Sequence, residues 1–250
     1  MHYRILQAFS FIGASLSLLF PFPGLAASPD YSPRAIVIGF LGGFVGQKNA
    51  AHTEVQLAQR LKDDFPAALQ VRIFQNHNGH QAHTEVLRLL DADGDGLLSA
   101  GEKQRARIAI YGHSWGASEA INLARTLARD QIPVLLTIQV DSVQKPWEDD
   151  ALIPANVTQA VNYYQSDGIL HGRSQIRAAD GSRTRILGNF RFDYKKRQVS
   201  SAGFPWYAKI LMRPHIEIES DPEVWQKVES LIRSTLVSPA AVAKDWPPQE

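Results

Sequence analysis

Short apolar runs alternate with amphipathic stretches along residues 34–236 of the chain. Apolar runs that end in glycine or polar residues are typical of buried parallel strands, whereas apolar residues at helical spacing indicate amphipathic helices. Because strands that alternate with helices form βαβ crossovers, the pattern predicts an α/β fold, with a mainly parallel sheet and helices on both faces. The predicted strands are 34–40, 71–74, 107–111 and 133–140, with weaker patterns at 160–164 and 186–192, and the predicted helices are 54–61, 84–90 and 117–129.

A further helix is marked near the end of this region by its own start pattern. Asp221 is suited to be the N-cap, and Pro222 stands at the first helical position, where a missing N–H costs no hydrogen bond. Val224 and Val228 then follow at helical spacing. We expect a helix from Pro222 onward and a flexible tail at 239–250.

The first residues have the pattern of an export sequence. Arg4 precedes an apolar run at 5–20, prolines follow, and small residues at 24–27 offer a cleavage site. The run is shorter than the ~20 residues that a spanning helix needs, so no stable membrane span is expected after cleavage. We expect a signal peptide at 1–27, a domain at 28–238 and a secreted or periplasmic location.

Composition narrows the function classes. The 250 residues fit one domain, and the formal net charge of +1 at pH 7 comes without runs of lysine or arginine. The electrostatics therefore indicate neither a nucleic acid nor an anionic membrane as partner. The chain has no cysteine, which excludes a thiol nucleophile and a cysteine-based zinc site.

Gly112-His113-Ser114-Trp115-Gly116 matches the pattern G-x-S-x-G between a predicted strand and a predicted helix. The glycines permit the tight turn that exposes a serine at the end of a strand. In this setting the sequence resembles the α/β-hydrolase superfamily, in a reduced form without a full cap domain. The resemblance implies a serine hydrolase whose nucleophile, Ser114, is followed along the chain by an acid and a histidine.

We weigh two acids and two histidines for these roles. Asp141 directly follows the strand 133–140, at the edge where parallel sheets place their sites, and is the preferred acid; Asp167 is its rival. His215 stands between the last predicted strand and the final helix and is the preferred base, with His171 in reserve. The other histidines precede Ser114 or lie in the predicted signal peptide.

The oxyanion of an acyl-transfer intermediate needs two backbone N–H donors. The resemblance implies that one comes from Trp115, which follows the nucleophile, and the other from the glycine-rich loop after the first strand, at Phe40. That loop has neither G-x-G-x-x-G nor the phosphate-binding pattern with Gly-Lys, so nucleotide binding is not indicated.

The segment 91–102 has the residues of a twelve-residue EF-hand loop at every defining position. Gly96 allows the sharp turn, and calcium prefers the oxygen ligands around it. No second loop and no full exiting helix accompany the segment, so the sequence predicts one structural calcium ion and not a calcium sensor. The predicted ligands are Asp91, Asp93, Asp95, the carbonyl of Leu97, Ser99 through a water and the bidentate Glu102.

These features predict an esterase-like or lipase-like enzyme that forms an acyl-enzyme on Ser114. Small-molecule carboxylic esters are the first expected substrates, with thioesters and lipid esters next. Because fold never guarantees function, an inactive calcium-binding protein on a hydrolase scaffold is the alternative.

Overall fold

The computed structural model describes residues 34–43, 49–197, 199–200, 204 and 206–237. Six strands form one sheet in the order β2-β1-β3-β4-β6-β8, and each neighbouring pair is parallel. The strands are β1 (Ala35–Leu41), β2 (Leu69–Gln75), β3 (Ile108–His113), β4 (Val134–Val140), β6 (Val157–Tyr164) and β8 (Arg185–Arg191), with a separate two-stranded pair of β5 (Leu152–Ile153) and β7 (Arg177–Ala178). The helices are α1 (Thr53–Asp64), α2 (Gly79–Leu90), α3 (Ala100–Gln104), α4 (Trp115–Arg129), α5 (Trp206–Ser220) and α6 (Pro222–Leu236).

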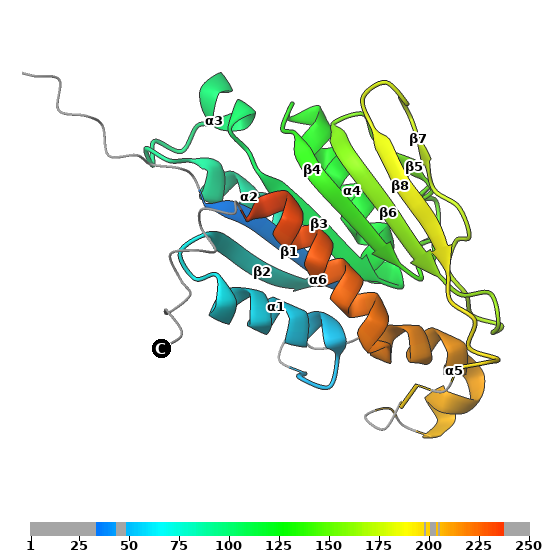
Figure 1. Ribbon diagram of the computed structural model, residues 1–250. Coiled ribbons are helices and arrows are strands. Elements are labelled where there is room, and N and C mark those ends of the chain that lie inside the picture. The colour runs from blue at the N-terminus through cyan, green and yellow to red at the C-terminus, as the bar shows by residue number, and fades with distance from the viewer. Residues whose placement is uncertain (1–33, 44–48, 198, 201–203, 205, 238–250) are drawn as a thin grey trace, which may run out of the picture. The chain divides into compact units, whose positions relative to one another are not determined.

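Alternate residues of each strand enter two different cores. In β1, Val37 packs with α1 and α6 on one face of the sheet, whereas Ile38 packs with α2 and α4 on the other. Figure 1 shows α1 and α6 on the near face and α4 behind the sheet. Since both faces are covered, the strands are apolar throughout, which is what the sequence pattern indicated.

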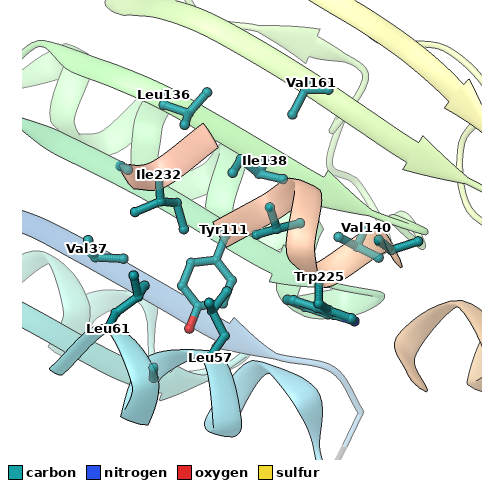
Figure 2. Packing of buried hydrophobic residues seen from close by; sticks show 14 of the residues in the cluster. Val37, Leu57, Leu61, Tyr111, Leu136, Ile138, Val140, Val161, Trp225 and Ile232 are labelled. Carbon is teal, nitrogen blue, oxygen red and sulfur yellow. The ribbon is translucent and has the colours of Figure 1, made fainter. Parts of the chain in front are cut away.

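The near-face core is built around two large side chains that face each other, Tyr111 of β3 and Trp225 of α6 (Figure 2). Their ring centroids lie 6.3 Å apart at an interplanar angle of 79°, an edge-to-face contact. The Tyr111 hydroxyl donates to the Glu54 carbonyl at 3.0 Å, which joins α1 to the middle of the sheet. The packing thus fixes both the start of α1 and the strand that leads to Ser114.

The predicted fold class, a mainly parallel α/β sheet covered on both faces, is confirmed, including the two weaker strands as β6 and β8. The cap of α6 is confirmed too, because the Asp221 carboxylate accepts from the Glu223 N–H at 2.9 Å.

Helix α5 was not predicted from the sequence. It is kinked at Met212, where φ is −131° and ψ is 24°, two residues before Pro214. A proline within a helix removes one backbone hydrogen bond and crowds the preceding turn, so this stretch lacks an uninterrupted helical pattern.

The predicted signal peptide at 1–27 and the predicted tail at 239–250 lie outside the described residues. Among the helices that the structure describes, none is long and apolar enough to cross a membrane.

Candidate active site

Ser114 occupies a strained turn between β3 and α4, with φ 56° and ψ −127°. Residues other than glycine rarely adopt such a positive φ, and holding one there costs about 1–3 kcal/mol. The flanking glycines are required by space: a Cβ on Gly112 would lie 2.4 Å from the Gly116 carbonyl carbon, and a Cβ on Gly116 would lie 2.4 Å from the Phe40 oxygen. The predicted elbow is therefore present as a built feature of the backbone.

Asp141 follows β4 and lies beside this turn. The Ser114 N–H donates to the Val140 carbonyl at 3.0 Å, so the serine and the acid are held at the carboxyl ends of adjacent strands. The Asp141 side chain is fully buried. Its Oδ1 accepts from the N–H groups of Gln165, at 3.1 Å, and Gly172, at 2.7 Å. Its Oδ2 accepts from Gln165 Nε2 at 2.8 Å.

His215, from the kinked helix α5, completes the group. Its Nδ1 lies 2.6 Å from Asp141 Oδ2, and its ring is tilted by 32° against the ring of His113, with centroids 4.5 Å apart. His113 is bonded directly to Ser114, so this contact places His215 against the end of the strand that carries the nucleophile. Asp141 thus contacts His215 and lies beside Ser114 at one edge of the sheet, and the three catalytic roles stay predictions.

The rival residues lie in other surroundings. Asp167 is held by Arg191 Nη2 at 2.7 Å and by the Tyr194 N–H at 2.8 Å, so its carboxylate ties the β6 end to the segment after β8. His171 is exposed, and its Nδ1 lies 3.2 Å from the Gly172 carbonyl. In the described residues, no hydrogen bond joins the Ser114 side chain to His215, Asp167 or His171, and His215 differs from His171 in its contact with a buried carboxylate.

The residues predicted for the oxyanion hole flank the elbow. Trp115 is the first residue of α4, and Phe40 lies near the carboxyl end of β1, with its side chain fully buried. Gly42 lies nearer to the nucleophile than the sequence indicated, since a Cβ placed on it would be 3.1 Å from the Ser114 Cβ. The glycine pair at 42–43 was the feature of the sequence that could have pointed to it.

A second group of titratable residues lies behind the elbow, and sequence reasoning missed it. We call it the His/Glu cluster; it consists of His52, Glu54, His113 and Glu219, exposed by 9%, 1%, 2% and 5%. His52 Nδ1 contacts Glu219 Oε1. His113 Nδ1 lies 3.6 Å from Glu54 Oε1 and 3.5 Å from Glu219 Oε2.

In the His/Glu cluster the pKa values of Glu54, Glu219 and His113 are shifted toward the uncharged forms, because the groups are removed from water. Burial, followed by repulsion from Glu219, raises the pKa of Glu54 to about 8. Burial raises the pKa of Glu219 to about 8 as well. Burial, followed by the charge of His215, holds the pKa of His113 well below its ordinary value, so this imidazole is neutral.

The predicted calcium loop, 91–102, follows the end of α2 and includes the first three residues of the short helix α3. Ligand oxygens of Asp91, Asp93 and Asp95 lie within 4.8 Å of one another. Gly96 has φ 81°, the positive value that the turn in such a loop demands. Hydrogen bonds from the Ala92 N–H and the Ser99 hydroxyl lower the pKa of Glu102 to about 2, which keeps this carboxylate ionised.

Leu97 and Ser99, two further predicted ligands, differ in their surroundings. Leu97 is 74% exposed, and its predicted ligand is the backbone carbonyl, because its aliphatic side chain has no donor atom. Ser99 accepts from the Glu102 N–H at 3.3 Å and begins α3 with a capping box. The Glu102 oxygens accept hydrogen bonds from Ala92 and Ser99 and lie outside the group formed by the three aspartates. The loop fits a calcium ion in donor type and backbone shape, and its occupancy stays a prediction.

No family model matches the chain, and no curated protein matches its sequence. Among solved structures, a cutinase-like protein from Cryptococcus sp. is similar at a TM-score of 0.41 and 14% identity, covering 82% of this chain and 95% of that one. Human thioesterase 2 is similar at a TM-score of 0.40 and 10% identity, covering 86% and 100%. An acetylxylan esterase is similar at a TM-score of 0.40 and 9% identity, covering 82% and 99%. At these values the likeness transfers no activity to this chain.

Proposed function

We propose that the protein is a serine hydrolase of the α/β-hydrolase type that cleaves carboxylic esters through an acyl-enzyme on Ser114. One observation carries the proposal: the buried Asp141 carboxylate holds Nδ1 of His215 at 2.6 Å, beside a serine in a strained strand-to-helix turn. Such strain persists only where the surrounding structure enforces it, and it is found mostly at functional sites.

The proposed reaction assigns one task to each group. Ser114 Oγ attacks the carbonyl carbon of the ester while Nε2 of His215 accepts its proton. Asp141 keeps the other imidazole proton on Nδ1 and stabilises the imidazolium that forms. Backbone N–H groups of Trp115 and of the loop after β1 stabilise the oxyanion, with Phe40 as the predicted donor. His215 then gives its proton to the departing alcohol. In the second half of the reaction His215 takes a proton from water, the water oxygen attacks the acyl carbon, and the carboxylic acid product leaves as Ser114 regains its proton.

We further propose that one calcium ion bound by the loop 91–102 stabilises this domain without taking part in the chemistry. The loop precedes β3 at its amino end, whereas Ser114 follows its carboxyl end, and a strand of this length separates them by roughly 15–20 Å. An ion at that distance does not polarise a substrate carbonyl. Export by the segment 1–27 belongs to the same proposal and is supported by the sequence pattern alone.

The experiment is a panel of p-nitrophenyl esters of increasing acyl length, assayed with the wild-type protein and with Ser114→Ala. The expected result is hydrolysis that Ser114→Ala reduces to the uncatalysed background, whereas Ser234→Ala, which alters an exposed serine of α6, retains it. A folded wild-type protein that hydrolyses no ester in the panel would favour the inactive calcium-binding alternative.

A further inference from the structure

The His/Glu cluster has more hydrogen-bonding capacity than its surroundings use. Within the described residues, both ring nitrogens of His113 and Oε2 of Glu54 are buried and have no hydrogen-bond partner. Leaving a buried polar atom unpaired is unfavourable, because the atom loses its hydrogen bonds to water and gains none in the protein. Native proteins rarely leave several such atoms unpaired in one place, and a bound ion or water is a common reason.

The two carboxyl groups of the cluster are also poorly placed for burial unless a proton or a cation neutralises them. Glu54 and Glu219 lie close together, away from water, and their ion-pair partners in the described part of the chain are histidines. The cations that usually neutralise buried carboxylates, lysine and arginine, are not among these contacts. A buried pair of carboxylates requires either a proton or a cation between them.

The spacing of the donor atoms matches a four-coordinate metal. Zinc binds His nitrogens and carboxylate oxygens at about 2.0–2.1 Å in tetrahedral geometry, which places neighbouring donors about 3.3 Å apart. His113 Nδ1 lies 3.5 and 3.6 Å from the two carboxylates, and ligand atoms of His52, Glu54 and Glu219 all lie within 4.8 Å of one another. His113 lies outside that group of three, so its ring has to move toward His52 before all four donors surround one ion.

We propose that His52, Glu54, His113 and Glu219 bind one zinc ion in a closed structural site behind the nucleophile elbow. Two carboxylates and two neutral imidazoles around Zn²⁺ give a site with no net charge, which suits burial. The two nitrogen donors favour zinc over calcium, which takes six to eight oxygen ligands. Four protein ligands leave no open position, so the ion holds structure and does not activate water.

The site joins the two elements that carry the catalytic groups. His113 ends β3 and directly precedes Ser114. Glu219 lies one helical turn after His215 on α5, so the two side chains share a face of that helix. An ion bound by His113 and Glu219 therefore fixes α5 against the nucleophile strand, while His52 and Glu54 attach the start of α1.

Metal content and ligand geometry test the proposal without any activity assay, so its outcome is independent of the proposed function. The full chain is prepared without a histidine tag, stripped with 1,10-phenanthroline, and reloaded with zinc in saturating calcium, which keeps the loop 91–102 filled. We expect one zinc per chain by mass spectrometry and a higher melting temperature after zinc addition. Cobalt(II) in place of zinc should give the intense visible absorption of a tetrahedral site.

Glu219→Gln is the test variant, because it keeps the shape and removes one anionic ligand. Glu217→Gln is the matched control: it alters a buried glutamate of the same helix, whose Oε1 accepts from Arg213 Nε at 3.0 Å. We expect Glu219→Gln to lose the zinc and the thermal shift, and Glu217→Gln to keep both. Wild-type protein that holds no zinc after reloading, or Glu219→Gln that holds as much as wild type, overturns the proposal.

Discussion

Replacing Asp141 by asparagine should disable the enzyme without unfolding it, and the hydrogen bonds at this side chain show why. Oδ1 faces the backbone N–H groups of Gln165 and Gly172, which can only donate. The amide oxygen of the introduced asparagine must therefore take the place of Oδ1, because an NH₂ group there would leave both donors unpaired. The NH₂ group then points at His215 Nδ1, in the place that Oδ2 occupies in the wild-type protein.

In the wild-type protein Gln165 Nε2 donates to Asp141 Oδ2, so the introduced NH₂ group also faces a donor on Gln165. The Gln165 amide cannot turn over to present its oxygen instead. Its Nε2 also donates to the Leu170 carbonyl at 2.9 Å, and its Oε1 accepts from the N–H groups of Asp167 and Gly168. His215 must then accept at Nδ1 and carry its proton on Nε2, where it cannot take the proton of Ser114.

The wrong tautomer lowers kcat by about 10⁴ in a serine triad, and at about 1.4 kcal/mol for each factor of ten this equals about 5.5 kcal/mol of lost transition-state stabilisation. The assay compares kcat/KM on a short p-nitrophenyl ester for Asp141→Asn and for Asp167→Asn, with circular dichroism to verify folding. Asp167→Asn should stay near wild type, because that carboxylate binds Arg191 and not the histidine. Near-normal turnover in Asp141→Asn, with a large loss in Asp167→Asn, would refute the reasoning.

Three further outcomes follow from the described contacts. Calcium at a hundredfold excess over Kd should stabilise the fold by about 2.7 kcal/mol and raise the melting temperature by about 5–11 °C, with turnover unchanged. Glu102→Gln should remove this shift, and a melting temperature that does not respond to calcium contradicts the prediction. Gly116→Ala places a Cβ 2.4 Å from a backbone oxygen of β1 and should slow fluorophosphonate labelling, unlike Gly181→Ala, whose Cβ meets nothing within 4 Å. Asp221→Ala removes the N-cap of α6 and the hydrogen-bond partner of the Tyr194 hydroxyl. It should lower the free energy of unfolding by about 2 kcal/mol in urea titrations, and an unchanged urea midpoint contradicts the stabilising role of Asp221.

The sheet could be predicted because its signals are local. Each central strand is a short apolar run, and burial on both faces requires that composition. The elbow could be predicted because its glycine pattern is contained in five residues, although the space around Gly116 is limited by the distant Phe40 backbone. Asp141 could be preferred over Asp167 for a similar reason, since it follows directly after the strongly apolar strand β4.

Helix α5 and the His/Glu cluster could not be predicted, because they depend on contacts between residues that are far apart in the sequence. Helix α5 is interrupted by Pro214, so neither its length nor the place of His215 inside it follows from periodicity. The His/Glu cluster joins residues from the start of α1, the end of β3 and the end of α5. His52 and Glu219 are separated by 167 positions, and only the packing of these elements brings them into contact.

The most direct test of the central claim is covalent labelling with a fluorophosphonate, which reacts with a serine only when a neighbouring base activates it. Proteolysis and mass spectrometry should locate the adduct on Ser114, and Ser114→Ala should abolish labelling while the protein keeps its melting temperature. A folded protein that resists the probe across the pH range of its stability, or one that carries the adduct on a different serine, would contradict the assignment of Ser114 as the nucleophile.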